Sequence, residues 1–429
     1  MKKVTIIICI IATTIIVINS CNEQKNSEQV TVPVADPNPA MNHPDSLAWQ
    51  LFITINSPSD PNNPKGNTIW ENWALARDVY ADPNKKPVWD SVTKSSKSLE
   101  DLETLPLQQS ARLQVQNQLA NKKIKSHGLF NIFIAPDELN DSTGISLDET
   151  RMNRTVFDFL VNNDLYNAEG QEEYFNQNKK IDLPIDAKEV KAIWIKIKDT
   201  DTSYYHYHSF EKINPKTGQK EIQYWGLVSL HIISKDLPQW TWATFENKRN
   251  IRLPNAEKDP NTKSRDLYGI TSEGKISPAL LNDFKTHNMS NKWENYILRG
   301  TQTAYTDFKG KPTLLANTYT EDGFVKSSSC ITCHSKATIG ARLDFKDLPK
   351  AIQDTIKYGI DKKKVLKASN FVNRLPIFKV DTKDTTIADN GIPNPEWYAD
   401  KNGKTTYLQT DFMWSFFRAK RKHPYQSEK

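Results

Sequence analysis

The strongest constraint on this chain is the motif at residues 330–334, Cys-Ile-Thr-Cys-His. Cys-x-x-Cys-His is the attachment signature of a c-type haem, in which each thiol forms a thioether with one haem vinyl group. The histidine after the second cysteine is then held beneath the macrocycle, where its imidazole becomes the proximal iron ligand. The sequence therefore predicts one covalent haem c, held by Cys330, Cys333 and His334.

Two other chemistries use a Cys-x-x-Cys pair. A thioredoxin-like redox pair usually follows a strand and opens a helix in a βαβ unit, whereas three serines at residues 327–329 precede this motif and no βαβ pattern surrounds it. A structural zinc site needs two further Cys or His ligands at short spacing, and the next histidine, His423, is distant in sequence. Haem attachment is therefore the favoured interpretation.

The N-terminus has the features of an export signal. Lys2 and Lys3 precede an almost wholly apolar stretch at residues 4–18, which is short for a membrane span and typical of a signal peptide. The stretch ends in Ile-Asn-Ser-Cys, which resembles the lipobox of bacterial lipoproteins. We expect residues 1–20 to be removed and Cys21 to carry lipid, which places the protein on the extracytoplasmic side of the bacterial cell envelope. An uncleaved N-terminal anchor is the alternative and gives the same side.

The remaining cysteines and the charge balance exclude other classes. Cys9 leaves with the signal, so no cysteine is left for a disulfide once Cys21 is lipidated and the motif carries haem. The formal net charge is +6 and falls to +4 without the two lysines of the signal. Basic and acidic residues are interspersed, and no nucleic-acid partner is expected.

The rest of the chain predicts one folded domain after a tether. Residues 21–45 are polar, contain several prolines and lack hydrophobic periodicity, so they predict a disordered tether. Residues 46–425 are long enough to bury a core without disulfides. Within them the patterns predict a core helix that Asp45 caps, helices over 69–80, 95–125 and part of 150–180, and strands over 190–197, 204–208 and 222–233. The fold class is therefore α+β, with a central antiparallel sheet flanked by helices.

Several stretches resemble a family of exported bacterial proteins of the cytochrome c class. The matching stretches are Ala48–Phe52, Leu230–Lys235, Trp240–Glu246, Leu315–Thr318 leading into the haem motif, and Thr410–Phe416. Their spread implies one integrated haem domain, and the resemblance implies electron transfer and supplies no substrate. Asn247 departs from the family pattern, which more often has histidine there.

The sixth iron position separates an electron carrier from a haem enzyme. His231 is the first candidate for the second ligand, because it lies on an expected strand near Trp240 and Trp242, which could wall a haem pocket. A hydrogen-bonded core histidine is the simpler alternative. Met413 is the second candidate, although its aromatic neighbours favour core packing. The remaining candidates are His287 with Met289, His43, His127, His206, His208, His423, Met41 and Met152.

Three functions are compatible with these features. The first is a membrane-tethered monohaem c-type cytochrome that exchanges electrons with redox partner proteins outside the cytoplasm. The second is a peroxidase-like or oxidase-like haem enzyme with an open sixth position, which the size of the chain favours. In that case Glu246 is a candidate acid or base, against the simpler interpretation of an exposed carboxylate at a strand end. The third is a haem-bearing structural lipoprotein subunit of a larger complex.

Overall fold

The structure is a computed structural model that describes residues 38–94, 146–214, 217–250, 268–269, 275–321, 325, 328–340, 390–395, 398–399, 402–405 and 407–422. The chain divides into two units, Met1–Asn38 and Pro39–Lys429. The described helices and strands belong to the second unit. The expected signal peptide, Cys21, most of the tether and the helical region at 95–125 lie outside the described residues.

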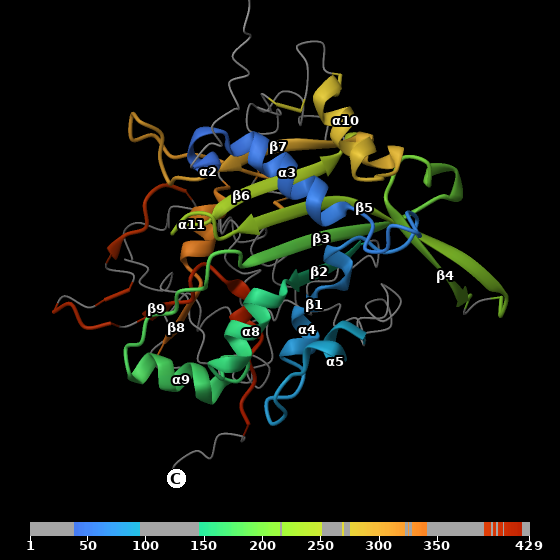
Figure 1. Cartoon of the computed structure of the whole chain (residues 1–429). Helices are drawn as coiled ribbons and strands as arrows, with labels where there is room; N and C mark the ends of the chain where they lie inside the picture. Colours follow the sequence, from blue (N-terminus) through green and yellow to red (C-terminus); the bar gives the residue numbers. More distant parts are fainter. Residues whose placement is uncertain are drawn as a thin grey trace, which may run out of the picture. The chain divides into compact units, whose positions relative to one another are not determined.

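A large antiparallel sheet forms the centre of the second unit (Figure 1). Seven of the described strands make up this sheet. Their order is β1-β2-β3-β5-β6-β7, with β4 paired to β5. The predicted α+β class with an antiparallel sheet is therefore confirmed. The strands are β1 Ala74–Leu75, β2 Ser146–Met152, β3 Lys188–Ile197, β4 Tyr207–Ile213, β5 Lys220–Ser234, β6 Thr241–Asn247 and β7 Tyr296–Gln302.

Helices and a small second sheet surround this centre. The described α-helices are α2 Pro39–Asn42, α3 Pro44–Asn56, α4 Ala76–Val79, α5 Trp89–Lys94, α8 Arg154–Asn162, α9 Ala168–Asn176, α10 Pro278–Thr286 and α11 Cys330–Ser335. Two short strands, β8 Thr338–Gly340 and β9 Tyr407–Gln409, pair antiparallel. Among the described helices, none combines the length and apolarity that crossing a bilayer requires.

Four local predictions differ from the structure, and one of them is the strand expected at 204–208, which begins only at Tyr207 as β4. Helix α3 begins at Pro44, whose ring fixes the backbone for a first helical turn, so His43 and not Asp45 is the cap. The expected helix over 69–80 is interrupted, because Ala74–Leu75 pairs with β2 between the 3₁₀-helix η1 (Trp70–Asn72) and α4. The single helix expected within 150–180 is two helices.

Those two helices are separated by local capping. Asn153 accepts a hydrogen bond from the backbone of Val156 and starts α8, and Asn167 does the same for Gly170 at the start of α9. Between them Asp164 has a φ of 58°, a left-handed conformation that a continuing helix cannot contain. Asp164 therefore prevents α8 from continuing, and the Asn167 cap begins α9.

The two faces of the sheet carry different side chains. Because residues alternate along a strand, one face is apolar and packs against α3, which crosses it in Figure 1. Rings from α3 meet the sheet here: Phe52 and Trp49 lie 4.3 and 4.9 Å from Phe245 of β6 between ring centroids. The other face carries Lys191, Ser229, His231, Trp242, Thr244 and Glu246.

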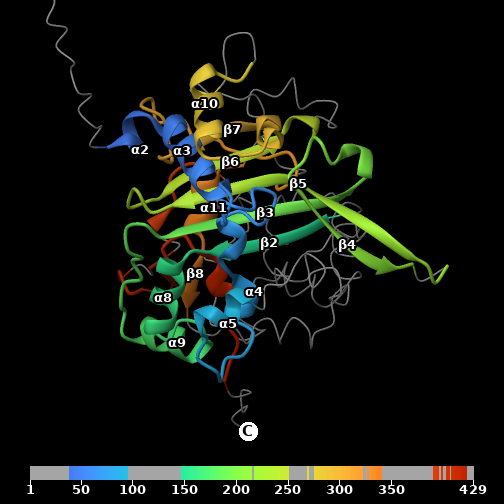
Figure 2. The ribbon, with the colours of Figure 1, turned by 45° about the vertical axis from the view of Figure 1, so that its right-hand side comes forward.

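Helix α11, with the Cys-x-x-Cys-His motif, packs on that second face. Cys330 and Ile331 share a hydrophobic cluster with Ile233 and Trp242 of the sheet. Figure 2 shows the same arrangement from a second angle, with α3 in front of the sheet and α11 behind it. The alternation of the strands therefore places the motif against the polar face, next to His231 and its neighbours.

A buried acid gives the fold a testable dependence on pH. Glu189 of β3 is 4 % exposed, and its Oε1 has no hydrogen-bond partner among the described residues. Burial raises the pKa of Glu189 to about 8 from a usual value of 4.5. At a pH between these two pKa values the folded state holds a proton on Glu189 that the unfolded chain releases. The free energy of unfolding therefore falls as pH rises through this range.

We expect Glu189→Gln to remove this dependence, because the amide is neutral at every pH. The free energy of unfolding is measured with urea at about pH 5.5 and about pH 7.5. Between these pH values it should fall by up to about 1.4 kcal/mol per pH unit more in the native chain than in the variant. Glu173→Gln, at an exposed position of α9, is the matched control and should follow the native curve. Parallel pH curves for the native chain and Glu189→Gln would contradict the expectation.

Candidate functional site

The motif lies on a short helix whose start is fixed by β7. Helix α11 has six residues and begins at Cys330 itself. Gln302 of β7 accepts a hydrogen bond from the Ile331 backbone N–H at 3.0 Å and donates to the Ser329 hydroxyl at 2.8 Å. Cys330 and Cys333, three residues apart in the helix, share one side of it. Neither forms a disulfide within the described residues.

His334 is held in one tautomer by the backbone. Its Nδ1 donates to the carbonyl of Phe412 at 2.8 Å, which leaves Nε2 as the nitrogen that can bind a metal. The ring of Trp242 lies 4.5 Å from the His334 ring between centroids. Burial lowers the pKa of His334 to about 4, with the Phe412 carbonyl opposing and Lys191 adding to the shift, so the imidazole is neutral.

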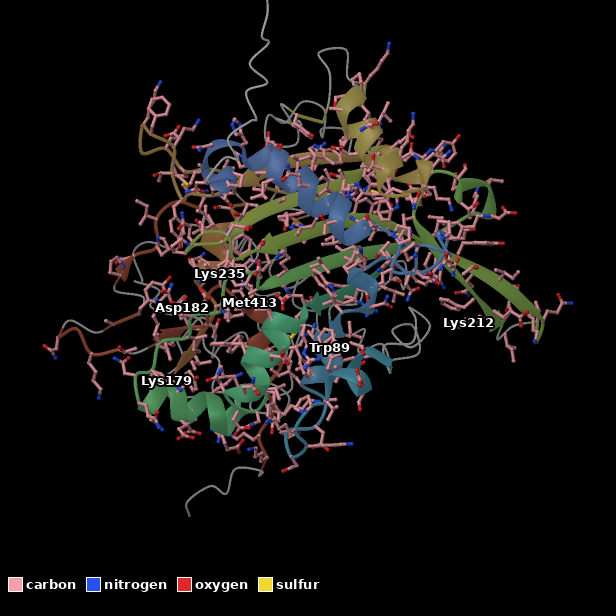
Figure 3. The ribbon with its side chains drawn as sticks, in the orientation of Figure 1. Trp89, Lys179, Asp182, Lys212, Lys235 and Met413 are labelled. Carbon is pink, nitrogen blue, oxygen red and sulfur yellow. The ribbon has the colours of Figure 1, made fainter. Side chains whose placement is uncertain are left out.

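A buried ion pair positions the Phe412 carbonyl. Lys235 Nζ lies 2.6 and 2.7 Å from the two carboxylate oxygens of Asp411, the residue before Phe412. Both side chains are almost fully buried, and Asp182 adds a second carboxylate 3.1 Å from the same ammonium. Figure 3 shows Lys235 and Asp182 together, with Met413 close to them in that view.

The turn at Asp411 has an unusual backbone that these contacts stabilise. Asp411 and Phe412 have φ values of 51° and 69°, in the left-handed region that residues other than glycine rarely adopt. The Asp411 carboxylate also accepts from the Leu183 backbone N–H at 2.7 Å and from Trp240 Nε1 at 3.2 Å. Trp240 thus supports the turn, whereas Trp242 is the tryptophan that contacts His334.

The same turn is tied to the motif through the small sheet. Strand β8 follows α11 and pairs with β9, which leads into the turn. The Thr410 backbone N–H and hydroxyl both bond to the carbonyl of Ala337, at 3.0 and 3.1 Å. His334 and the carbonyl that orients it therefore belong to one hydrogen-bonded unit, although 78 residues separate them in sequence.

His231 is part-buried, with 12 % of its side chain exposed, on the face that carries the motif. It lies on β5, paired with Lys191 of β3 and Thr244 of β6. Its Nε2 has no hydrogen-bond partner among the described residues, since the nearest carboxylate oxygen, of Glu321, is 3.7 Å away. Burial lowers the pKa of His231 to about 3, with Lys191 and His334 as further causes, so the ring is neutral and within electrostatic reach of His334.

An unsatisfied, neutral, buried imidazole nitrogen is what a second iron ligand would present. Buried polar atoms in proteins nearly always have partners, and His231 Nε2 is one of several described buried atoms without a hydrogen bond, with Glu246 Oε2 on the same face. The second-ligand role of His231 and the simpler alternative, a core histidine, both stay predictions. The residues present therefore fit a haem held by Cys330, Cys333 and His334.

Two buried carboxylates lie on the same face. The segment 315–321 crosses the sheet: Asn317 donates to Thr244 Oγ1 at 3.0 Å, and the Thr318 hydroxyl donates to Glu246. The Asn317 backbone N–H donates to Glu321 at 2.6 Å. Burial raises the pKa of Glu246 to about 7 and that of Glu321 to about 8. Glu246 is 2 % exposed, so the expectation of an exposed carboxylate is wrong: β5, β7 and segment 315–321 enclose it.

The other candidate ligands fall into distinct places. Met413 and Met152 are fully buried in the hydrophobic cluster that contains Cys330. His206, His208 and Met289 contact residues of the α3 face, on the opposite side of the sheet. His43, His287 and Met41 are exposed, while His127 and His423 lie outside the described residues. Asn247 donates to the Tyr204 carbonyl at 2.8 Å.

The Lys235–Asp411 pair is the functional feature that the sequence analysis missed. A separation of 176 residues gives no periodic signal. One signal was present: both residues are charged positions inside largely apolar stretches, Leu230–Lys235 and Thr410–Phe416. Charged residues inside otherwise apolar motifs indicate burial with a partner.

Comparison with known proteins gives no match: no protein-family model, no curated protein and no solved structure matches this chain.

We expect Asp411→Asn to destabilise the protein strongly. The substitution leaves the buried Lys235 ammonium with the half-exposed Asp182 carboxylate as its remaining charged neighbour, a change that costs up to about 3 kcal/mol in unfolding free energy. Glu211→Gln is the matched control, because it breaks an exposed Lys220–Glu211 pair of similar length, 2.8 Å, which is worth about 0.5 kcal/mol. Urea unfolding measures both. Equal losses for the two variants would contradict the assigned importance of the buried pair.

Proposed function

We propose that the protein is a membrane-tethered monohaem c-type cytochrome that transfers electrons outside the cytoplasm. The observation that supports this best is the pairing of two imidazoles on one face of the sheet. His334 has its Nδ1 committed to a backbone carbonyl, and the buried Nε2 of His231 has no hydrogen-bond partner within the part of the chain that the structure describes. Two neutral imidazoles of this kind suit the closed, low-spin iron of an electron carrier.

Each residue of the motif has a separate part in this proposal. Cys330 and Cys333 hold the macrocycle covalently, and His334 binds through Nε2. When bound, the haem supplies one-electron redox chemistry. The protein keeps the site rigid and dry: Trp242 packs on the His334 ring, and the Phe412 carbonyl fixes its orientation.

His231 is a better second ligand than Met413. Met413 directly follows Phe412, whose carbonyl accepts from Nδ1 of His334, so it lies beside the nitrogen that would not bind the iron. Met413 is also fully buried among apolar residues, which explains it as core. His231 has no comparable explanation without a ligand.

The tether completes the proposal. A lipidated Cys21 would hold the domain at the surface of a membrane on the extracytoplasmic side, where covalent haem c is assembled. Redox partner proteins in the same compartment would then exchange electrons with it, and a diffusible substrate is not required.

A haem enzyme is the second candidate. Glu246 and Glu321 favour it, because two buried carboxylates on the face of His231 offer groups that could give or take protons during a reaction. Such an enzyme needs an open or displaceable sixth position, whereas a carrier does not. Carbon monoxide binding therefore separates the two functions.

The proposal predicts the absorption spectrum of the protein produced with cytochrome c maturation machinery. We expect a low-spin spectrum in both oxidation states that carbon monoxide does not change. His231→Ala should convert the iron to a high-spin form that binds carbon monoxide in the reduced state, because the second ligand is lost. Native protein that is high-spin and binds carbon monoxide would instead support the enzyme.

Two variants control for indirect effects. Met413→Leu conserves volume and should leave the spectrum unchanged. His287→Ala removes an exposed histidine of the C-terminal end of α10 and should also change nothing. A high-spin spectrum for Met413→Leu, with His231→Ala unchanged, would transfer the ligand role to Met413.

A further inference from the structure

A second set of metal-binding side chains converges away from the haem motif. Glu71, His206 and His208 each offer one ligand atom, and these atoms all lie within 4.8 Å of one another. The Nε2 atoms of both histidines approach the same oxygen, Oε1 of Glu71, with His206 at 3.1 Å and His208 closer. The cluster contacts Trp194 and Trp293, which belong to the α3 face of the sheet.

The fold brings these residues together from two distant segments. His206 and His208 flank the start of β4, and because side chains alternate along an extended chain, they project to the same side. Glu71 comes from η1, 135 residues earlier than His206. The antiparallel pairing of β4 with β5 sets the height of the two imidazoles relative to the sheet.

The carboxylate is oriented by its own contacts. The Thr68 backbone N–H donates to Oε2 of Glu71 at 2.6 Å, which turns Oε1 toward the histidines. Arg151 donates to the Glu71 carbonyl at 2.7 Å and pairs with Glu149 at 2.8 Å. Trp194 Nε1 donates to that same Glu149 at 2.9 Å. Outer contacts of this kind are typical of metal sites, where they hold the ligands in place before the ion binds.

The imidazoles are also fixed, and one side of the cluster is open. The His206 ring stacks on Trp293 with centroids 4.7 Å apart, and the His208 ring lies 5.3 Å from Trp194. Side-chain exposure rises from 4 % for Glu71 through 13 % for His206 to 33 % for His208. An ion and its water molecules therefore have access from the His208 side.

We propose that Glu71, His206 and His208 bind one divalent transition metal ion, such as Zn²⁺ or Fe²⁺, with water at the remaining positions. Two imidazoles and one carboxylate are a donor set that these metals prefer. Metal–ligand bonds of about 2.1 Å separate neighbouring ligand atoms by roughly 3.0 to 3.4 Å, and the His206–Glu71 distance of 3.1 Å falls in that range.

Three protein ligands with an open side distinguish this site from a purely structural one. Structural zinc sites use four protein ligands, whereas sites with three keep a position for water or an exchangeable ligand. The site lies on the opposite side of the sheet from Cys330 and shares no ligand with the proposed haem. A cluster in which both imidazoles merely hydrogen-bond to Glu71 without an ion is the alternative.

Calorimetric titration of the full chain with Zn²⁺, after removal of metals by a chelator, tests the proposal. We expect one equivalent to bind to the native protein. His208→Ala should weaken binding at least tenfold, because a direct ligand is lost. His287→Ala removes an exposed histidine outside the cluster and should bind like the native chain. Zinc should also raise the melting temperature of the native protein and not that of His208→Ala.

His208→Gln provides a second variant that keeps a polar side chain of similar size, and a circular dichroism spectrum in chelator checks that it is folded. Failure of the native chain to bind one equivalent, or unchanged affinity in folded His208→Gln, would overturn the proposal. The haem spectrum should be the same in every variant. Because the His208 variants leave the Cys-x-x-Cys-His motif intact, the difference between them and the native chain reports on the Glu71 cluster alone, and loss of one proposal leaves the other standing.

Discussion

The buried Lys235–Asp411 ion pair is the interaction on which the geometry around His334 depends. It stabilises two consecutive residues in the left-handed region, and that turn presents the Phe412 carbonyl to His334 Nδ1. One end of the pair lies directly after β5 and the other follows β9, so the sheet and the C-terminal segment meet at this point. A buried pair of this kind contributes little net stability. Its effect is to select one backbone conformation.

The sheet separates two sets of candidate ligands. Alternation of side chains gives an apolar face under α3 and a polar face under α11, with His231 on the polar one. The Glu71 cluster lies at the β4 end of the apolar side, where aromatic rings of that side fix the histidines. A redox cofactor and a second metal ion would then share a rigid frame while remaining on opposite sides of it.

Short-range features could be predicted from the sequence, and long-range ones could not. Strands β3 and β5 follow from their alternation and β-branched residues, whereas the haem site at Cys330, Cys333 and His334 stays a prediction from a local motif. The helix expected at 69–80 failed because pairing of Ala74–Leu75 with β2 overrides local propensity. Glu246 was placed on the surface because nothing local shows that segment 315–321 covers it. The spacing of His206 and His208 is visible in the sequence, but only the fold brings Glu71 to them.

Retention of haem after denaturation tests the central claim most directly. The mature chain, produced with cytochrome c maturation machinery, would be denatured, separated by electrophoresis and stained for haem, beside a variant with serine at both Cys330 and Cys333. We expect haem to remain with the native chain and to be absent from the double variant, because the thioether bonds survive unfolding. Haem that leaves the native chain on denaturation, or a native chain that contains none, would contradict a covalent haem at this motif.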